Sequence, residues 1–167
     1  SYAVFLHDDM TGHPDYFQLN LTSPIDEIQY YSMLVGFFKK FEKTTGLKIK
    51  CSVHPKSNKK NIYSLLKGID CSFGNTAELV KNSKLVLLHC TTALSYAILF
   101  NKPAIFLTSN DLNNSWIGPT IHSFAKEING QIVNLNSVFE ENLDLKKLLM
   151  IDELKYQNYK NNYLKFP

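Results

Sequence analysis

The sequence contains no arginine and no long apolar run. All 18 basic side chains are lysines, and they are spread along the 167 residues to a net charge of only +3. Such a weak and dispersed charge does not mark a nucleic-acid binder, so we expect no nucleic-acid partner. No apolar stretch approaches the ~18 residues that a membrane-spanning helix needs. The length instead suits one α/β domain over residues 1–167 with a core of its own.

Cysteine is scarce, and Cys51, Cys71 and Cys90 each lie in or beside a predicted strand. An odd number without paired spacing argues against a disulfide framework and against a zinc site. We therefore expect reduced, buried thiols in a cytoplasmic protein, with no bound metal. Cys90 is open to a second interpretation as a nucleophile, although a cysteine that closes a buried strand is more often an inert small hydrophobe.

Three familiar motifs are also absent. The chain has no Gly-x-Gly-x-x-Gly, no Gly-x-x-x-x-Gly-Lys-Ser/Thr and no Gly-x-Ser-x-Gly. Dinucleotide dehydrogenases, P-loop nucleoside-triphosphatases and α/β-hydrolases are disfavoured accordingly. The chain enters an apolar strand directly after Ser1, with no signal peptide before it. We expect it to be a domain cut from a longer polypeptide.

The most informative stretch covers residues 84–107. It opens with a four-residue apolar run typical of a strand buried on both faces. The apolar residues change to helical spacing after Thr92, and a second apolar strand follows Pro103. This is one parallel βαβ unit with polar residues at its first turn. Because helix N-termini at such turns offer free N–H groups and partial positive charge, the turn predicts a phosphate site.

The alternation of strands and helices continues along the whole chain. It predicts an α/β fold, a doubly wound, mostly parallel, Rossmann-like sheet of five or six strands with helices on both faces. Segments 10–24 and 108–119 lack periodicity and are predicted to be loops. Strands are predicted over 2–6, 47–53, 69–73, 85–88, 104–107 and 131–135, and helices over 26–45, 62–66, 77–82, 93–102, 120–128, 143–149 and 152–164.

Polar side chains gather where the predicted strands end. Since the carboxyl ends of parallel strands meet at one edge of the sheet, we expect these clusters to converge there. An imidazole and an ammonium follow the second strand, and both suit a phosphate. Paired threonine hydroxyls follow the fourth strand. The candidate phosphate-binding residues are His54, Lys56, Ser57, Thr76, His89, Thr91 and Thr92.

Asp8 and Asp9 follow His7 at the end of the first strand. Adjacent carboxylates can serve as a general base or bind a metal, and they can equally cap and solvate a loop. We take Asp8 and Asp9 as the candidate catalytic residues and leave the capping interpretation open. The histidine on the 120–128 helix, His122, is expected to be a packed or surface residue.

The order of these motifs resembles the C-terminal, nucleotide-binding half of GT-B glycosyltransferases. The resemblance rests on three features in chain order. His54-Pro55 follows a predicted strand, and the segment 74–83 comes next. A second predicted strand is then followed by Thr91-Thr92, a predicted helix and Asn-Lys-Pro103. It is most similar to bacterial surface-polysaccharide enzymes of the sialyltransferase-like, Kdo-transferase-like and polyol-phosphate-transferase groups. It covers residues 47–107 well and the remainder by topology alone.

The resemblance implies specific roles in binding a CMP-sugar. In the groups that use such donors, the histidine of the His-Pro motif and a later Ser/Thr pair contact the nucleotide phosphate, which assigns that contact to His54, Thr91 and Thr92. Those groups take their general base from an acidic pair followed by glycine. Here Asp8-Asp9 is followed by Met10 and lies in the same half as the His-Pro.

A complete GT-B enzyme has two such domains, with the active site between them. The resemblance therefore implies a glycosyltransferase, or half of one, with a nucleotide-activated sugar, a glycan acceptor and a missing N-terminal domain as partners. It implies no cofactor. It also implies a cytoplasmic location, with the full-length protein associated with the inner face of the membrane. A sugar-nucleotide epimerase and a non-catalytic domain that binds a nucleotide or a partner are the alternatives.

Overall fold

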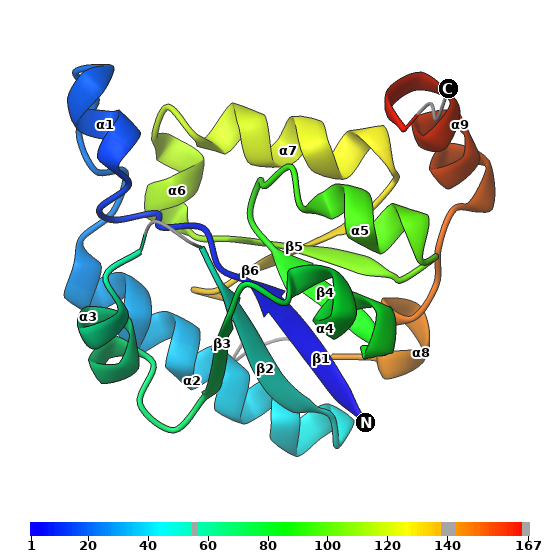
Figure 1. The fold of residues 1–167 in the computed structure, drawn as a ribbon, viewed down its shortest axis with the longest axis horizontal. Coiled ribbons are helices and arrows are strands. Elements are labelled where there is room, and N and C mark those ends of the chain that lie inside the picture. The colour runs from blue at the N-terminus through cyan, green and yellow to red at the C-terminus, as the bar shows by residue number, and fades with distance from the viewer. Residues whose placement is uncertain (55–56, 138–142, 165–167) are drawn as a thin grey trace.

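A computed structural model describes residues 1–54, 57–137 and 143–164. Its strands form one parallel sheet in the order β3-β2-β1-β4-β5-β6 (Figure 1). This confirms the predicted doubly wound α/β fold. The strands are β1 Tyr2–Leu6, β2 Lys48–Val53, β3 Asp70–Phe73, β4 Leu85–Leu88, β5 Ala104–Thr108 and β6 Gln131–Asn134.

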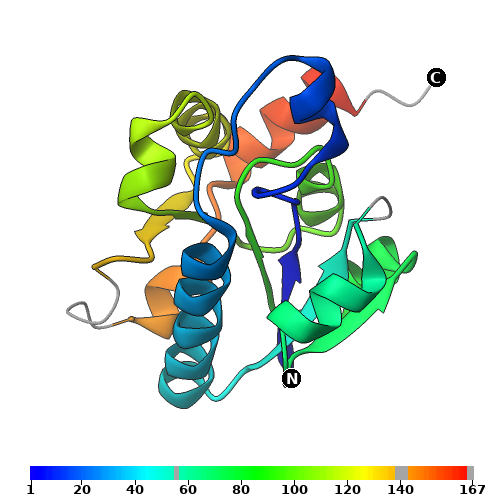
Figure 2. The ribbon, with the colours of Figure 1, turned by 90° about the vertical axis from the view of Figure 1, so that its left-hand side faces the viewer.

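Helices lie on both faces of the sheet. Figure 1 shows α4 and α5 in front of the strands and α2 behind them, and Figure 2 shows the same layers from the side. The helices are α1 Pro14–Gln18, α2 Glu27–Thr45, α3 Lys59–Leu65, α4 Thr76–Asn82, α5 Leu94–Leu99, α6 Asn110–Asn114, α7 Gly118–Glu127, α8 Leu145–Leu148 and α9 Glu153–Tyr163.

The strand order reverses between β1 and β4. From β1 the chain winds outward through β2 and β3, and from β4 it winds the opposite way through β5 and β6. Because the connections on the two sides leave in opposite directions, they open a crevice above the carboxyl ends of β1 and β4. Residues that follow these two strands are therefore placed at the natural ligand site of the fold.

The core fills both faces of the sheet, and its most aromatic part lies between α2 and the central strands. Every residue of β4 and β5 is buried, as their apolar runs predict. Helix α2 presents one aromatic and aliphatic face to the sheet, and this face contains the aromatic residues that the helical spacing marks as core. Its buried residues are Tyr30, Tyr31, Leu34, Phe37, Phe38 and Phe41.

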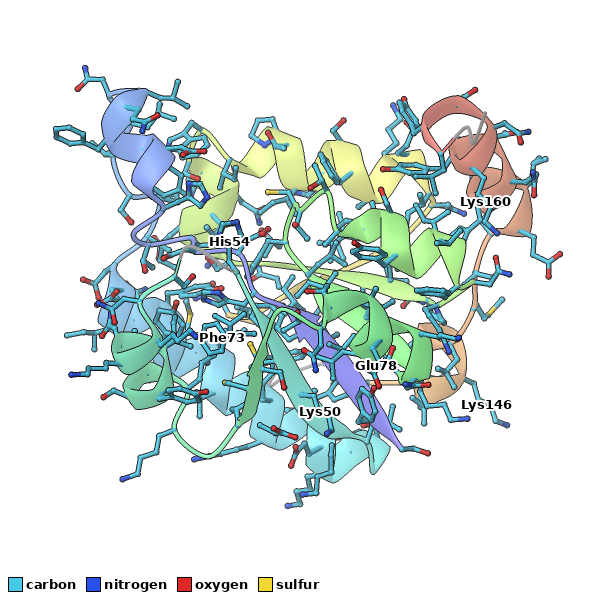
Figure 3. The ribbon with its side chains drawn as sticks, in the orientation of Figure 1. Lys50, His54, Phe73, Glu78, Lys146 and Lys160 are labelled. Carbon is cyan, nitrogen blue, oxygen red and sulfur yellow. The ribbon has the colours of Figure 1, made fainter. Side chains whose placement is uncertain are left out.

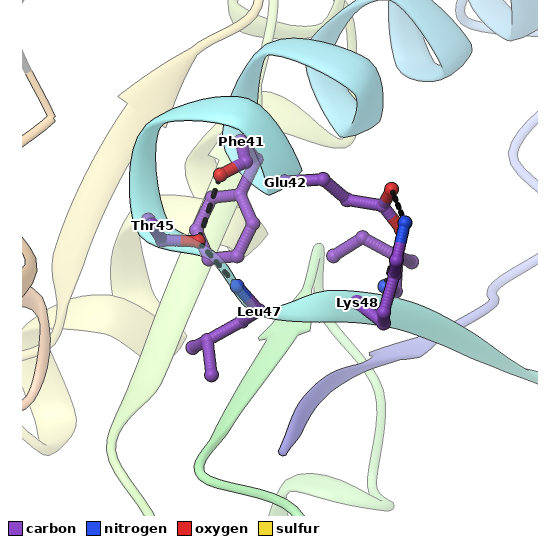
Figure 4. A network of polar contacts seen from close by, with 6 residues as sticks. Phe41, Glu42, Thr45, Leu47 and Lys48 are labelled. Carbon is purple, nitrogen blue, oxygen red and sulfur yellow. Dashed lines mark hydrogen bonds and ion pairs between the residues drawn. The ribbon is translucent and has the colours of Figure 1, made fainter.

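Polar contacts join the end of α2 to the start of β2 (Figure 4). Gly46 ends the helix in the left-handed conformation at φ 72°, which glycine adopts without steric cost. Thr45 Oγ1 donates to the carbonyl of Phe41 at 2.7 Å and accepts from Leu47 N at 3.2 Å. Glu42 accepts from the first residues of β2. These contacts hold the strand against the helix end.

Two segments predicted as loops contain short helices. Segment 10–24 holds α1, where Pro14 occupies the first turn and His13 Nδ1 accepts from the Asp15 backbone at 3.2 Å. Proline is favoured at the first helical position, so a residue that suggests a loop starts a helix here. Segment 108–119 likewise holds α6. The loop predictions are wrong because five-residue helices are too short to show an apolar period.

The three cysteines are free thiols. Cys51 is buried, whereas Cys71 and Cys90 are partly exposed. Over the ranges described, the longest helices also lack the combination of length and apolar character that crossing a membrane demands.

Candidate functional site

A small cavity lies at the crevice where the strand order reverses. It holds about 60 Å³ and is bordered by residues that follow or end β1, β2 and β4, together with the first turn of α4. That volume suits a small polar group or a few waters. We call it the switch-point cavity. Its lining residues are Leu6, His7, Ser52, Val53, His54, Thr76, Thr91 and Ala93.

Three of the residues singled out by sequence, His54, Thr76 and Thr91, line this one cavity. They come from the end of β2, the start of α4 and the turn after β4, segments brought together by the strand order. Figure 3 shows His54 at the same edge of the molecule as α1 and α6. That these residues hold a ligand stays a prediction, but the fold does bring them to one place.

Hydroxyl groups dominate the polar wall of the cavity. Ser52 Oγ and Thr76 Oγ1 lie 2.7 Å apart and share one hydrogen bond. Because one proton suffices for that bond, the second hydroxyl proton is free to donate into the cavity. Thr91 Oγ1 accepts from Ala93 N at 3.3 Å, which turns its side chain toward the start of α5.

Asp8 contacts the cavity lining through a hydrogen bond with Thr91. Its Oδ2 accepts from Cys90 N at 3.4 Å, and its carboxylate is also hydrogen-bonded by the Thr91 side chain. Burial raises the pKa of Asp8 to about 6, although those two hydrogen bonds oppose the rise. The carboxylate is therefore mostly ionised at neutral pH and still basic enough to accept a proton there.

Asp9 faces a different pocket. Its Oδ1 accepts from Gly12 N at 2.9 Å, which is the loop-capping arrangement left open above. The pocket beside it holds about 190 Å³ and is also lined by Glu27, Tyr31 and two asparagine amides, Asn58 and Asn61. The two adjacent carboxylates thus lie in different pockets. Asp8 contacts the wall of the switch-point cavity, and Asp9 does not.

His89 does not line the switch-point cavity. It is fully buried, its Nε2 lies 2.8 Å from Tyr30 Oη, and its Nδ1 lies 2.7 Å from the Leu107 carbonyl. Both ring nitrogens are occupied, so none remains for a phosphate. Burial also lowers the pKa of His89 to about 4, which keeps the ring neutral. Its place directly after a buried strand made it look like a ligand residue from the sequence.

Cys90 and Thr92 also lie outside the cavity lining. Burial, and secondarily the charge of Asp8, raise the pKa of the Cys90 thiol to about 12, so it is not a thiolate at neutral pH. Thr92 is exposed, and its carbonyl accepts from Ser95 N in the turn that begins α5. Of the threonine pair, Thr91 is the member at the cavity.

Two further candidates follow His54. Ser57 is buried, and its hydroxyl has no hydrogen-bond partner among the described residues. The lysine between them, Lys56, lies outside the described residues. Ser57 N donates to the His54 carbonyl at 3.0 Å, so these two residues lie close together.

The segment around α1 packs against the same edge of the sheet. The rings of His13 and His54 meet at 5.1 Å between centroids, and those of Tyr16 and Trp116 meet at 5.2 Å. Trp116 Nε1 donates to the Thr22 carbonyl at 3.1 Å. Segment 10–24 therefore contacts the switch-point cavity through His54 and the 108–119 segment through Trp116.

Two polar residues of the cavity lining carry no assignment from sequence reasoning, His7 and Ser52. His7 stands at the same position after β1 as His89 after β4, and that signal could have identified it. Ser52 gives no such signal, because it lies inside a strand whose alternation is ordinary. Among the described residues, no group of three or more histidine, cysteine, aspartate or glutamate side chains is arranged to hold a metal ion.

The solved structures that are similar to this chain include a glycosyltransferase. No protein-family model matches the chain, and no curated protein matches it. The chain is similar to the crystal structure of the glycosyltransferase SnogD from Streptomyces nogalater, with 10% sequence identity and a TM-score of 0.48. The match covers 99% of this chain and 40% of that one, so the chain spans less than half the length of that structure.

Proposed function

We propose that this chain is the nucleotide-binding half of a glycosyltransferase of bacterial surface-polysaccharide synthesis, and that the switch-point cavity takes the phosphate of a nucleotide-activated sugar. The observation that carries the proposal is the convergence of His54, Thr76 and Thr91 on one cavity at the reversal of strand order. Hydroxyl and imidazole donors at this position suit an anion. The motif order around the same residues supports a CMP-sugar as the ligand.

In the proposed reaction, the cavity stabilises the phosphate that leaves when the sugar is transferred. Negative charge grows on the leaving oxygen as the glycosidic bond to the donor breaks, and donors already in place lower the barrier. Thr76 and the imidazole of His54 fill this role, and Thr91 joins them when its hydroxyl proton turns from the Asp8 carboxylate to the phosphate. Asp8 is the residue we assign as base for the acceptor hydroxyl, since it is ionised at neutral pH and lies beside Thr91.

Catalysis on this proposal needs a second domain. In a two-domain enzyme the acceptor glycan binds across the cleft from the nucleotide, and this chain supplies one wall. The partners we propose are therefore the missing N-terminal domain, the nucleotide-sugar and the glycan acceptor, with peripheral attachment of the full-length protein to the membrane where the acceptor lies. The isolated chain is expected to bind nucleotide without transferring sugar.

Calorimetric titration of the isolated chain tests the proposal. CMP, CDP, UDP and GDP are compared, and cytidine serves as the matched ligand without phosphate. We expect CMP to bind at least tenfold more tightly than cytidine, because a hydrogen bond to a charged group contributes about 1.5–3 kcal/mol. Equal affinity for CMP and cytidine would remove the phosphate assignment. Preference for UDP or GDP would keep the phosphate site and reject the CMP-sugar.

A further inference from the structure

His7 has a ring nitrogen without a partner at the wall of the switch-point cavity. The side chain is 3% exposed, and its Nδ1 is one of two buried side-chain polar atoms without a hydrogen-bond partner among the described residues. Native proteins pair nearly all such atoms, so an unpaired one calls for an explanation. A bound group that completes the hydrogen bond is the simplest one.

The other contacts of the ring hold this nitrogen in place. His7 Nε2 lies 2.8 Å from Tyr31 Oη, and the two rings are stacked at 6.0 Å between centroids. The ring of Phe5 meets its edge at 6.1 Å. His7 lines the switch-point cavity and Tyr31 does not, so the nitrogen left for the cavity is Nδ1. A ring fixed in this way is preorganised for one contact.

We propose that His7 is a ligand-contacting residue whose Nδ1–H donates a hydrogen bond to an oxygen of the bound phosphate. This inference rests on the proposed function and adds a residue to it. Ser52, Thr76 and Thr91 supply neutral hydroxyls to the cavity, so His7 and His54 are the two lining groups that can carry positive charge. A phosphate therefore has a specific reason to engage both imidazoles.

The charges around His7 allow its Nδ1 to be protonated when an anion binds. Burial lowers its pKa to about 4 in the unliganded protein, the nearby Asp9 raises it, and His54 lowers it further. His89 behind it stays neutral, and Tyr31 can either donate to Nε2 or accept from it. A phosphate oxygen at Nδ1 favours either the Nδ1–H tautomer or the full imidazolium, and both provide the donor.

Nitrogen-15 NMR of the histidine rings in the wild-type chain tests this directly. Spectra are recorded at pH 7 without ligand, with CMP, and with sulfate, an anion whose charge does not change near this pH. We expect the His7 Nδ1 resonance to move to the position of a protonated nitrogen with CMP and, at higher concentration, with sulfate. His122, which is bonded to Asn113 on the surface, serves as the internal control and should not respond.

Two variants separate the two ring nitrogens. His7→Gln places an amide near Nε2 and keeps a partner for Tyr31, but it offers nothing at Nδ1. His7→Asn places an amide near Nδ1 instead. We expect His7→Gln to weaken CMP binding about 10-fold or more while cytidine binding changes less than 2-fold, and His7→Asn to restore most of the CMP affinity. His122→Gln should bind CMP like the wild type.

The outcomes separate this inference from the proposed function. If CMP binds but neither the Nδ1 resonance nor the His7→Gln affinity changes, His7 is not a ligand contact, and the proposed function stands. If neither CMP nor sulfate binds, both are rejected. Should His7→Gln fail to fold, the wild-type spectra alone decide, because they need no substitution.

Discussion

The ends of β1 and β4 carry the same residue in the same position and use it differently. His7 and His89 each follow a buried strand directly, and each places Nε2 2.8 Å from a tyrosine of α2. The two tyrosines, Tyr31 and Tyr30, are consecutive. At His89 the second nitrogen bonds the Leu107 carbonyl of β5, whereas the second nitrogen of His7 has no partner within the described part of the chain and the ring lines a cavity.

This difference separates a histidine that supports the fold from one that is available to a ligand. The hydrogen bonds of His89 join α2, β4 and β5 and leave nothing for a ligand, so we regard His89 as a structural residue. His7 is held by α2 on one side and open on the other. The position of the neighbouring strands, and not the residue type, decides which of the two histidines keeps a ring nitrogen available for a ligand.

The largest expected difference is in stability. His89→Ala leaves the Tyr30 hydroxyl and the Leu107 carbonyl buried without a partner and opens a cavity, so we expect a loss of about 3–5 kcal/mol in the free energy of unfolding. His7→Ala removes one hydrogen bond while the Tyr31 hydroxyl keeps its contact with the Thr11 side chain, so we expect a smaller loss of about 1–3 kcal/mol. Urea unfolding of both variants measures this. Equal losses would contradict the division between structural and open histidine.

Acid should act on both histidines, and a ligand should protect one of them. Burial lowers the pKa of each ring to about 4. Unfolding returns it to about 6.5, so the stability present above pH 6.5 is lost as the pH falls toward 4, roughly 3 kcal/mol per ring. Urea unfolding at pH 7 and 4.5, with and without sulfate, should show the His7 share shrinking with sulfate.

The control for that experiment is His89→Gln. It removes the His89 share of the acid sensitivity and leaves the response to sulfate intact. Any contribution from Asp8 has the opposite sign and is common to the wild type and the variant, so it cancels in the comparison. If sulfate no longer reduces the acid-dependent loss of stability in His89→Gln, the anion binds at His89 and not at His7.

A third comparison concerns the adjacent threonines. Thr91 lines the cavity and Thr92 is exposed. Thr91→Val removes a hydroxyl without changing the shape of the side chain, and we expect CMP binding to weaken by about 1–3 kcal/mol. Thr92→Val is the matched control and should stay within ~0.5 kcal/mol of the wild type. Calorimetry decides, and equal effects would mean that the ligand contacts the exposed face of the turn.

The smallest expected effect is at Asp8. Its raised pKa means that the folded protein holds the Asp8 proton more tightly than the unfolded chain between pH 4 and 6, so ionisation destabilises the fold as the pH rises through that range. Asp8→Asn should therefore stabilise the protein by about 1–2 kcal/mol at pH 7, allowing for solvent screening. Thermal unfolding should show little gain at pH 4. A loss of stability at pH 7 would show that the hydrogen bonds of Asp8 outweigh its burial.

Sequence patterns were most reliable where a strand is buried on both faces or a helix buries one whole face. The apolar runs of β4 and β5 and the aromatic face of α2 predict their structures correctly, because burial leaves a period or a run that no exposed segment needs. Helices α1 and α6 were missed. Each has five residues and depends on a capping side chain, His13 in one and Ser109 in the other, so no period is visible.

The sequence by itself determined the fold class of this protein and the polar residues that end its strands. Both follow from local properties, the apolar period and the residue types at each strand end. Only the tertiary structure decided which of those polar residues share a cavity. The strand order 3-2-1-4-5-6 sets which strand ends are neighbours. It therefore brings His54, Thr76 and Thr91 to one cavity, and it places the Leu107 carbonyl where it bonds His89. A long-range pairing of strands leaves no mark in the residues near any one of them.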